Sequence, residues 1–405
     1  MLLRAAMVLQ FAAGGAVYPF ISILLRDRGI GVEQLSLILV ATSGALLFFP
    51  FLWGMVADRY VPLNRLFVWL NLGAAAALGI IATQTGFWGL LIGMVLYTIF
   101  LNPCFTLANA LAFHHLDDPR EQFGTMRAWG SVGWIVPFLP IAIWCALESK
   151  QRFDFTLYVG MGICVAMALL GLWLPHTPPG AAESHEVSDG KAQRRMAYFP
   201  AVRQLMRDRD FLALLISMFL MAGSYNLSMY YAPPFLEDLG VPRPWIGPVQ
   251  GIGVIFEIVL FQWLAGCLRR LNYAGVILLG CVVMLVRHVM FTTLSDPWSL
   301  SLSYLLAGAF IVYYFMGVSM LVNHLAGLEI RATAQTLISI CSQGLGPMFA
   351  NWASGRLAAV YHDSFRPVFL FATLLSVLAA LLIISRWRHL NEAGARPPNG
   401  AEARE

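Results

Sequence analysis

The sequence predicts an all-α membrane protein with 12 transmembrane helices arranged as two pseudo-symmetric bundles of six. The first observation is composition: 59% of the 405 residues are hydrophobic and only 12% are charged, with a mean hydropathy of +0.70. Soluble domains contain about 25% charged residues, so this chain lacks the polar side chains that would cover a water-exposed surface. The other two observations are the number of apolar segments and a repeat between the two halves of the chain.

Segments of about 20 apolar residues, the length that crosses a bilayer, can be placed twelve times. The first is too long for a cleaved leader, and we expect it to stay in the membrane. A polar stretch at 175–210, the expected cytoplasmic linker, separates one six-helix half (1–174) from the other (211–390), and 391–405 is expected to be a disordered cytoplasmic tail. The segments cover 5–25, 34–56, 66–84, 87–113, 123–147, 156–174, 211–235, 244–266, 274–294, 298–324, 332–354 and 366–387.

Lysine and arginine are distributed unequally between the two sets of loops. Of the 26 such residues, 17 lie on the side of the linker and seven on the other, while Arg127 and Arg287 lie within segments. Loops rich in these residues stay in the cytoplasm. We therefore expect a multi-pass protein of the cytoplasmic (inner) membrane with both termini in the cytoplasm.

The two halves also share a pattern of proline and glycine. Tyr18-Pro19-Phe20, Gly29 and Gly54 in the first half correspond to Pro233-Pro234-Phe235, Gly240 and Gly266 in the second, at offsets of 215, 211 and 212 residues. Near-constant offsets indicate a duplicated unit. Duplicated membrane bundles typically bind a ligand at the repeat interface near the middle of the bilayer, which favours a carrier.

Arg127, Ser131 and Trp134 follow one another at helical spacing in the fifth segment and so share one face. An arginine at the centre of a membrane helix costs roughly 2.5–3.5 kcal/mol, so Arg127 should face protein, water or a ligand. We expect this face to bind substrate, with the guanidinium contacting an anion and the indole stacking on a ring. The alternative is that Arg127 donates hydrogen bonds to backbone carbonyls or neutral hydroxyls.

Glu257 is the only one of the 22 acidic residues that lies deep inside a segment. A buried carboxylate can exchange protons near neutral pH, so Glu257 is a candidate proton-coupling residue, with Arg287 in the next segment as its partner. The alternative is an ion pair that locks the two helices together. The predicted segments contain two arginines but only one deeply placed acid, which leaves one excess positive charge. An anionic substrate such as a carboxylate would balance it.

Further polar residues lie within segments and could form hydrogen bonds with a ligand. Asn102 and Asn109 share one face of the fourth segment, Asn226 and Tyr230 share a face of the seventh, and Gln250 lies one heptad before Glu257. Such residues also commonly link helices to each other.

Motifs for other kinds of chemistry were not found. The six cysteines all lie in apolar segments without metal-ligand spacing, and no phosphate-binding loop, nucleophile elbow or zinc-protease motif occurs. We therefore expect no enzymatic activity, no cofactor, no metal and no nucleic-acid partner.

Several motifs resemble the major facilitator superfamily. Gly54-Met55-Val56-Ala57-Asp58-Arg59 is similar to its signature between the second and third segments, although Tyr60-Val61-Pro62-Leu63 replaces the usual basic run. The stretch Phe123 to Trp134, together with Val254 to Ile258 and Val286-Arg287, resembles lactose permease and its phenylpropionic acid and nucleoside relatives.

The resemblance implies a rocking two-bundle transporter, a conformational latch at Asp58 and Arg59, substrate contacts by Arg127 and Trp134, and coupling roles for Glu257 and Arg287. Asn109 stands where the sugar permease has an acid, and the region from Ala307 to Phe310 lacks that permease's proton-handling residues.

The favoured function is proton-coupled import of a small organic solute by a monomer, with an aromatic carboxylate of the phenylpropionate type as substrate. The alternatives are symport of a sugar or nucleoside, export of hydrophobic compounds, and a membrane-embedded sensor without flux.

Overall fold

The computed structural model describes residues 1–115, 119–148, 152–175, 202–326, 330–361 and 364–395, and within these ranges all regular secondary structure is helical. Eleven of the helical stretches are long and apolar enough to cross a membrane. The chain divides into two compact units, Met1–Ser188 with Pro233–Gly251, and Asp189–Ala232 with Ile252–Glu405.

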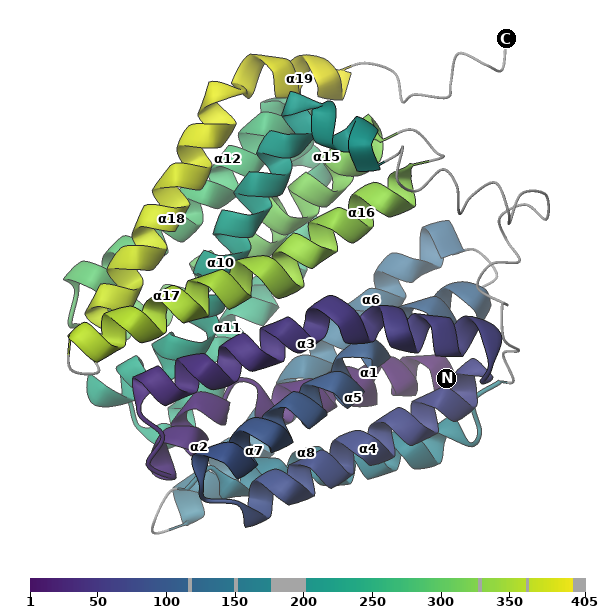
Figure 1. Cartoon of the computed structure of the whole chain (residues 1–405), viewed down its shortest axis with the longest axis vertical. Coiled ribbons are helices and arrows are strands. Elements are labelled where there is room, and N and C mark those ends of the chain that lie inside the picture. The colour runs from purple at the N-terminus through teal and green to yellow at the C-terminus, as the bar shows by residue number, and fades with distance from the viewer. Residues whose placement is uncertain (116–118, 149–151, 176–201, 327–329, 362–363, 396–405) are drawn as a thin grey trace. The chain divides into compact units, whose positions relative to one another are not determined.

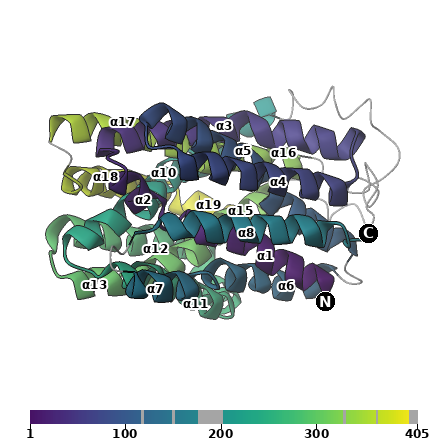
Figure 2. The ribbon, with the colours of Figure 1, turned by 90° about the horizontal axis from the view of Figure 1, so that it is seen from below.

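The first unit holds the first half of the sequence together with residues 233–251, which are the last turns of one later helix and the first turns of the next. In this unit α4 lies beside α5 and α8 (Figure 1), and α1 lies against both α6 and α8 (Figure 2). Its helices are α1 (Leu2–Val17), α2 (Ile21–Asp27), α3 (Val32–Arg59), α4 (Leu63–Thr83), α5 (Phe87–His115), α6 (Pro119–Ile135), α7 (Phe138–Leu147) and α8 (Asp154–Gly171).

The second unit holds most of the second half, and α12 lies beside α18 within it (Figure 1). Two short π-helical stretches, η2 and η3, interrupt its helices. The elements are α10 (Arg209–Asp238), α11 (Arg243–Phe261), α12 (Leu264–Thr293), α13 (Pro297–Leu302), α14 (Tyr304–Phe310), η2 (Ile311–Met316), α15 (Gly317–Leu325), α16 (Arg331–Ser339), η3 (Ile340–Leu345), α17 (Gly346–Val360), α18 (Arg366–Ser385) and α19 (Trp387–Ala395).

Several predicted segments are helices with a break inside them. The first is α1 followed by α2, broken around Pro19, and the fifth is α6 followed by α7, broken at Pro137. Proline interrupts a helix because it lacks an N–H group and its ring collides with the preceding turn. Pro233 and Pro234, in contrast, lie inside α10, which continues to Asp238.

The predicted segment at 332–354 differs most from a simple apolar helix. It consists of α16, η3 and α17 in succession, and it is the predicted segment that has no counterpart among the apolar helical stretches counted above. Its first half carries polar residues, including Arg331 and Gln335 in α16 and Ser342 in η3. At the C-terminus, α19 extends five residues beyond the predicted boundary at 390, and Asn391 accepts a hydrogen bond from the backbone N–H of Ala274.

Glycines bring the backbones of α1 and α6 into direct contact. A Cβ atom on Gly15 would lie 2.0 Å from the carbonyl oxygen of Trp134, and one on Gly133 would lie 2.3 Å from that of Val8. Small residues allow this close approach between membrane helices. The contact sets the position of Trp134 and of the rest of its helical face relative to α1.

Candidate functional site

Arg127 and Trp134 on α6 lie among aromatic side chains of the first unit. The Arg127 guanidinium lies over the Phe11 ring, 4.6 Å from its centre. The Trp134 indole is nearly parallel to the Tyr18 ring, with centres 6.3 Å apart and planes inclined by 13°, and Phe105 lies 6.4 Å from the same indole. Flat aromatic faces therefore surround the predicted substrate-binding face.

The polar residues predicted on α5 belong to the same region. Asn102 donates a hydrogen bond of 2.9 Å to the hydroxyl oxygen of Tyr18. The side-chain oxygen of Asn109 is buried and accepts no hydrogen bond from the described residues. Ser131 is buried on α6, between Arg127 and Trp134 in sequence. We call Arg127, Ser131, Trp134, Asn102 and Tyr18 the α6 site.

Arg287 lies in the second unit and is almost completely buried, with 2% of its surface exposed. Its guanidinium lies over two rings, 4.5 Å from the centre of Tyr304 and 5.0 Å from that of Phe291. The pairing of Arg287 with Glu257 stays a prediction.

Glu257 is buried on α11, and its backbone packs closely against α14. A Cβ atom on Gly308 would lie 2.1 Å from the carbonyl oxygen of Gly253 and 3.1 Å from the amide nitrogen of Glu257. Tyr225 on α10 lies within electrostatic range of both Glu257 and Arg287. The two charged residues thus share an aromatic neighbour in the second unit.

Two predicted ligand-binding amides form contacts with other helices. The side-chain oxygen of Asn226 accepts a hydrogen bond of 2.7 Å from Asn351 on α17. Gln250 donates a hydrogen bond of 3.0 Å to the carbonyl oxygen of Pro19, in the break between α1 and α2. These contacts fit the alternative role, in which such residues link helices. Tyr230 is half-buried on α10.

The predicted latch falls at the end of α3. Arg59 is exposed there, and the side chain of Asp58 lies outside the described residues, so its role stays a prediction.

Sequence reasoning missed the aromatic partners of the two arginines. Phe11, Phe291 and Tyr304 are three of 40 Phe and Tyr residues, and nothing in their spacing separates them from packing residues. Tyr18 entered the sequence analysis only as part of the Tyr18-Pro19-Phe20 motif of the repeat. The one usable signal was the glycine pair at Gly14 and Gly15, which indicates the face of α1 that a neighbouring helix approaches closely.

Comparison with known proteins gives a family. A family model described as "MFS_1 like family" matches residues 1–373. The nucleoside permease NupG of Escherichia coli is 22% identical, covering 99% of this chain and 98% of that protein. Its crystal structure superposes with a TM-score of 0.82 at 19% identity, covering 96% and 98% of the two chains.

Other relatives carry different names. A maltose permease of Geobacillus stearothermophilus is 25% identical and covers 95% of this chain and 94% of its own. A probable 3-phenylpropionic acid transporter of E. coli is 26% identical and covers 75% and 76%. The helical fold of the described residues agrees with the family match over residues 1–373. The chain belongs to the MFS_1-like family, within the major facilitator superfamily of membrane transporters.

Proposed function

We propose that this protein imports nucleosides across the cytoplasmic membrane together with protons, with its termini in the cytoplasm. The observation that carries the proposal is the α6 site, where the Trp134 indole and the Tyr18 ring lie nearly parallel, and where Arg127 lies on the same helical face as Trp134 and packs on Phe11. A nucleobase is flat and rich in hydrogen-bonding groups, so it suits stacking on an indole beside a guanidinium. Nucleoside-transporting relatives that cover almost the whole chain support the same substrate class.

The two arginines and one acid within the predicted segments suggested an anionic substrate to balance the excess positive charge, but the aromatic contacts of the arginines reduce that need. Arg127 lies on the face of Phe11, and Arg287 lies on Tyr304 and Phe291. The negative face of an aromatic ring stabilises a desolvated cation by up to about 2 kcal/mol. Since each interior arginine has such a partner, a neutral solute fits the α6 site, and we place nucleosides before arylcarboxylates.

Each residue then has a distinct role. Trp134 stacks on the base, Arg127 and Ser131 donate hydrogen bonds to the polar groups of the base or sugar, and Asn109 accepts one from a ligand N–H or O–H group. Glu257 takes up the coupled proton, because it is the one acid deep within a predicted span and lies within electrostatic range of Tyr225, as Arg287 does. Protonation removes its charge and so changes its attraction to Arg287.

The test is uptake of labelled uridine and adenosine into vesicles containing the purified protein, with and without an imposed inward proton gradient. We expect uptake that the gradient stimulates and a protonophore abolishes. Trp134→Ala should abolish saturable uptake and Trp134→Phe should retain most of it. Trp144→Ala is the matched control, because Trp144 on α7 stacks on Phe155 away from the α6 site.

Competition by unlabelled solutes separates the substrate classes. Sugars are the second candidate because the maltose permease matches the full chain, and arylpropionates are the third because of the phenylpropionic acid relative. If an arylpropionate displaced the labelled nucleoside while nucleosides did not displace each other, the nucleoside proposal would be rejected in favour of the carboxylate.

A further inference from the structure

One face of α16 and η3 carries a row of polar side chains. Arg331, Gln335, Ser339 and Gln343 are spaced four residues apart, so they follow one another along the same side of the helix. We call this row the α16 ridge. Gln343 is the midpoint of the predicted membrane segment at 332–354, and α16 and α17 run end to end along the second unit (Figure 1). The α16 ridge therefore carries polar groups to the middle of a membrane-crossing segment.

The inner end of the α16 ridge is exposed. Ser339 and Gln343 are both exposed, whereas Ile338 and Cys341 beside them are buried. Polar side chains in the middle of a membrane protein face its interior or a water-filled cavity, because lipid cannot form hydrogen bonds with them. Ser339 and Gln343 are therefore placed to contact water or a dissolved ligand.

The two glutamines of the α16 ridge differ in their contacts. The side-chain nitrogen of Gln335 donates hydrogen bonds of 2.9 Å to the carbonyl oxygen of Ser319 and to the side-chain oxygen of Asn323, both on α15. Gln335 thus links two helices. Within the part of the chain that the structure describes, the Gln343 side chain forms no hydrogen bond. Its amide keeps both a donor and an acceptor for a ligand.

Gln343 lies in a widened helical turn. The backbone N–H of Gly346 donates to the carbonyl oxygen of Cys341, five residues earlier, which is the bond of a π-helix. Short π-helical turns inside α-helices occur frequently at functional sites. A Cβ atom on Gly346 would lie 2.4 Å from the carbonyl oxygen of Phe219, so the backbone just after η3 is held against α10. The exposed amide therefore projects from a turn with a fixed base.

The close contact at Gly346 has a counterpart in the first unit. A Cβ atom on Gly133 in α6 would lie 2.3 Å from the carbonyl oxygen of Val8, as one on Gly346 lies close to that of Phe219. Val8 and Phe219 are 211 residues apart, and the two glycines are 213 residues apart. The helix formed by α16, η3 and α17 is therefore the repeat equivalent of α6, and the wide turns of η3 accommodate the extra residues.

The repeat equivalents of Arg127 and Ser131 fall on the α16 ridge. An offset of 212 residues, midway between the two values, relates Arg127 to Ser339 and Ser131 to Gln343. Positions that carry a guanidinium and a hydroxyl in the α6 site thus carry a hydroxyl and an amide in the second half of the sequence. Both of these groups are neutral, and both donate and accept hydrogen bonds.

We propose that Ser339 and Gln343 form a second substrate subsite, which hydrogen-bonds the ribose hydroxyls of the nucleoside. The proposal rests on the function proposed above and adds which residues hold the sugar. The 2′- and 3′-hydroxyls of ribose are adjacent, so one donates to the side-chain oxygen of Gln343 while the other accepts from its NH₂ group. The Ser339 hydroxyl lies one turn away on the same face and pairs with a further hydroxyl.

The measurement is competition by unlabelled uridine and by 2′,3′-dideoxyuridine, which lacks both hydroxyls, against uptake of labelled uridine into vesicles. The parent chain should prefer uridine by roughly 5–100-fold, the effect of two neutral hydrogen bonds. Gln343→Met keeps an unbranched side chain and removes the amide, so the preference should fall to about three-fold or less. Ser339→Ala should reduce the preference by a smaller factor.

Gln335→Met is the matched control, because Gln335 lies on the same ridge but is bonded to α15. It should lower the unfolding temperature and leave the preference for uridine unchanged. If Gln343→Met keeps the preference of the parent chain, or if Gln335→Met loses it equally, the subsite is rejected while the proposed function stands. A parent chain that takes up no nucleoside rejects the proposed function, and the ribose subsite with it.

A second measurement covers a Gln343→Met chain that does not fold. Gln343→Cys should react with a membrane-impermeant maleimide in vesicles, with the parent chain as the blank for the native cysteines, and saturating uridine should slow the reaction. Trp352→Cys, at an exposed apolar position of α17, is the control and should not respond to uridine. A cysteine at position 343 that does not react, or that reacts equally with and without uridine, overturns the subsite.

Discussion

Arg127 shows how a single buried cation is accommodated in an apolar helix. The guanidinium lies on the Phe11 ring, so part of the cost of removing it from water is recovered from the negative face of the ring. The flat, forked shape of the group lets its edge donate hydrogen bonds while its face is stacked. A lysine at the same position would keep the charge and lose both properties.

Arg127→Lys should therefore weaken nucleoside binding by roughly 10- to 100-fold, the value of about 1.5–3 kcal/mol for hydrogen bonds to a charged group. The unfolding temperature should change little, since the positive charge is kept. Quenching of intrinsic tryptophan fluorescence on titration with uridine gives the affinity. Equal losses of binding and of folded protein would instead indicate that Arg127 has a structural role.

Glu257 is the residue on which proton coupling depends. Glu257→Gln keeps the shape of the side chain and removes its titration, so uphill accumulation driven by a pH gradient should be lost while exchange of labelled for unlabelled nucleoside continues. Counterflow in vesicles measures the exchange. Glu392→Gln, on the exposed side of α19, is the control and should retain both activities. Gradient-driven accumulation by Glu257→Gln would exclude Glu257 as the coupling residue.

At the scale of helices, glycine determines how closely α1 and α6 approach. Gly15 has the Trp134 carbonyl where a side chain would begin, whereas Gly162 on α8 has no atom within 4 Å of that position. Adding the same methyl group should therefore have opposite effects at the two sites.

Gly15→Ala should destabilise the protein by roughly 1–3 kcal/mol through overpacking and should also displace Trp134. Gly162→Ala should be neutral or stabilising, because alanine restricts the unfolded chain more than glycine does. Thermal unfolding in detergent compares the two variants. A similar unfolding temperature for both variants would show that α1 and α6 can separate enough to admit a methyl group with little loss of stability.

Which helices form could be predicted from sequence, because about 20 apolar residues have few alternatives in a bilayer. Where they break could not, since Pro19 and Pro137 interrupt their segments but Pro233 and Pro234 do not. Helical periodicity also placed Arg127, Ser131 and Trp134 on one face. The aromatic partner of each arginine depends on which helices pack together, and the spacing along one helix carries no such information.

For the whole molecule, the duplication explains features that neither half shows alone. Arg28 donates to the backbone carbonyls of Ile81 and Gln84 at the end of α4, while Arg366 donates to the carbonyl of Thr292 at the equivalent end of α12. The same helix end is thus held by an arginine in both halves, although the arginine comes from a different place in each. A cation near a helix C-terminus is favourable because the last carbonyls carry partial negative charge.

Arg28 should consequently matter more to stability than Arg152, although both pair with Asp154. The Arg28 side chain is 6% exposed, and that of Arg152 is 45% exposed. Arg28→Gln should cost roughly 1.5–3 kcal/mol, since a buried charged hydrogen bond is lost, and Arg152→Gln less than about 1 kcal/mol. Thermal unfolding distinguishes them, and an equal effect would show that burial of Arg28 adds nothing.

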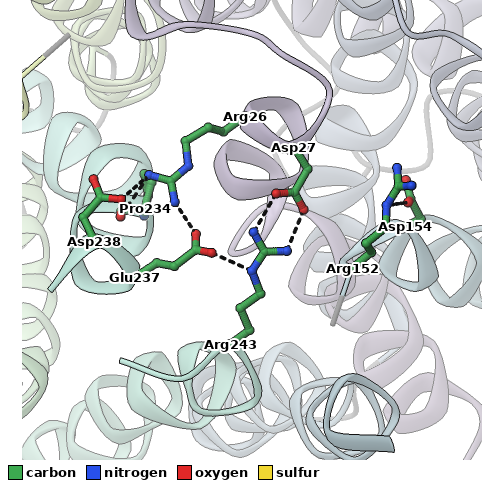
Figure 3. A network of polar contacts seen from close by, with 8 residues as sticks. All are labelled: Arg26, Asp27, Arg152, Asp154, Pro234, Glu237, Asp238 and Arg243. Carbon is green, nitrogen blue, oxygen red and sulfur yellow. Dashed lines mark hydrogen bonds and ion pairs between the residues drawn. The ribbon is translucent and has the colours of Figure 1, made fainter. Parts of the chain in front are cut away.

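Arg26 at the end of α2 pairs with Glu237 near the end of α10 (Figure 3), and the two positions correspond in the repeat because they are 211 residues apart, as Gly29 and Gly240 are. Their opposite charges bear on how the two halves assemble. An ancestral dimer of two identical six-helix copies would have set arginine against arginine, or glutamate against glutamate, so the present sequence favours unlike partners. If the two halves are produced as separate polypeptides, each should therefore co-purify with the other and not with a second copy of itself.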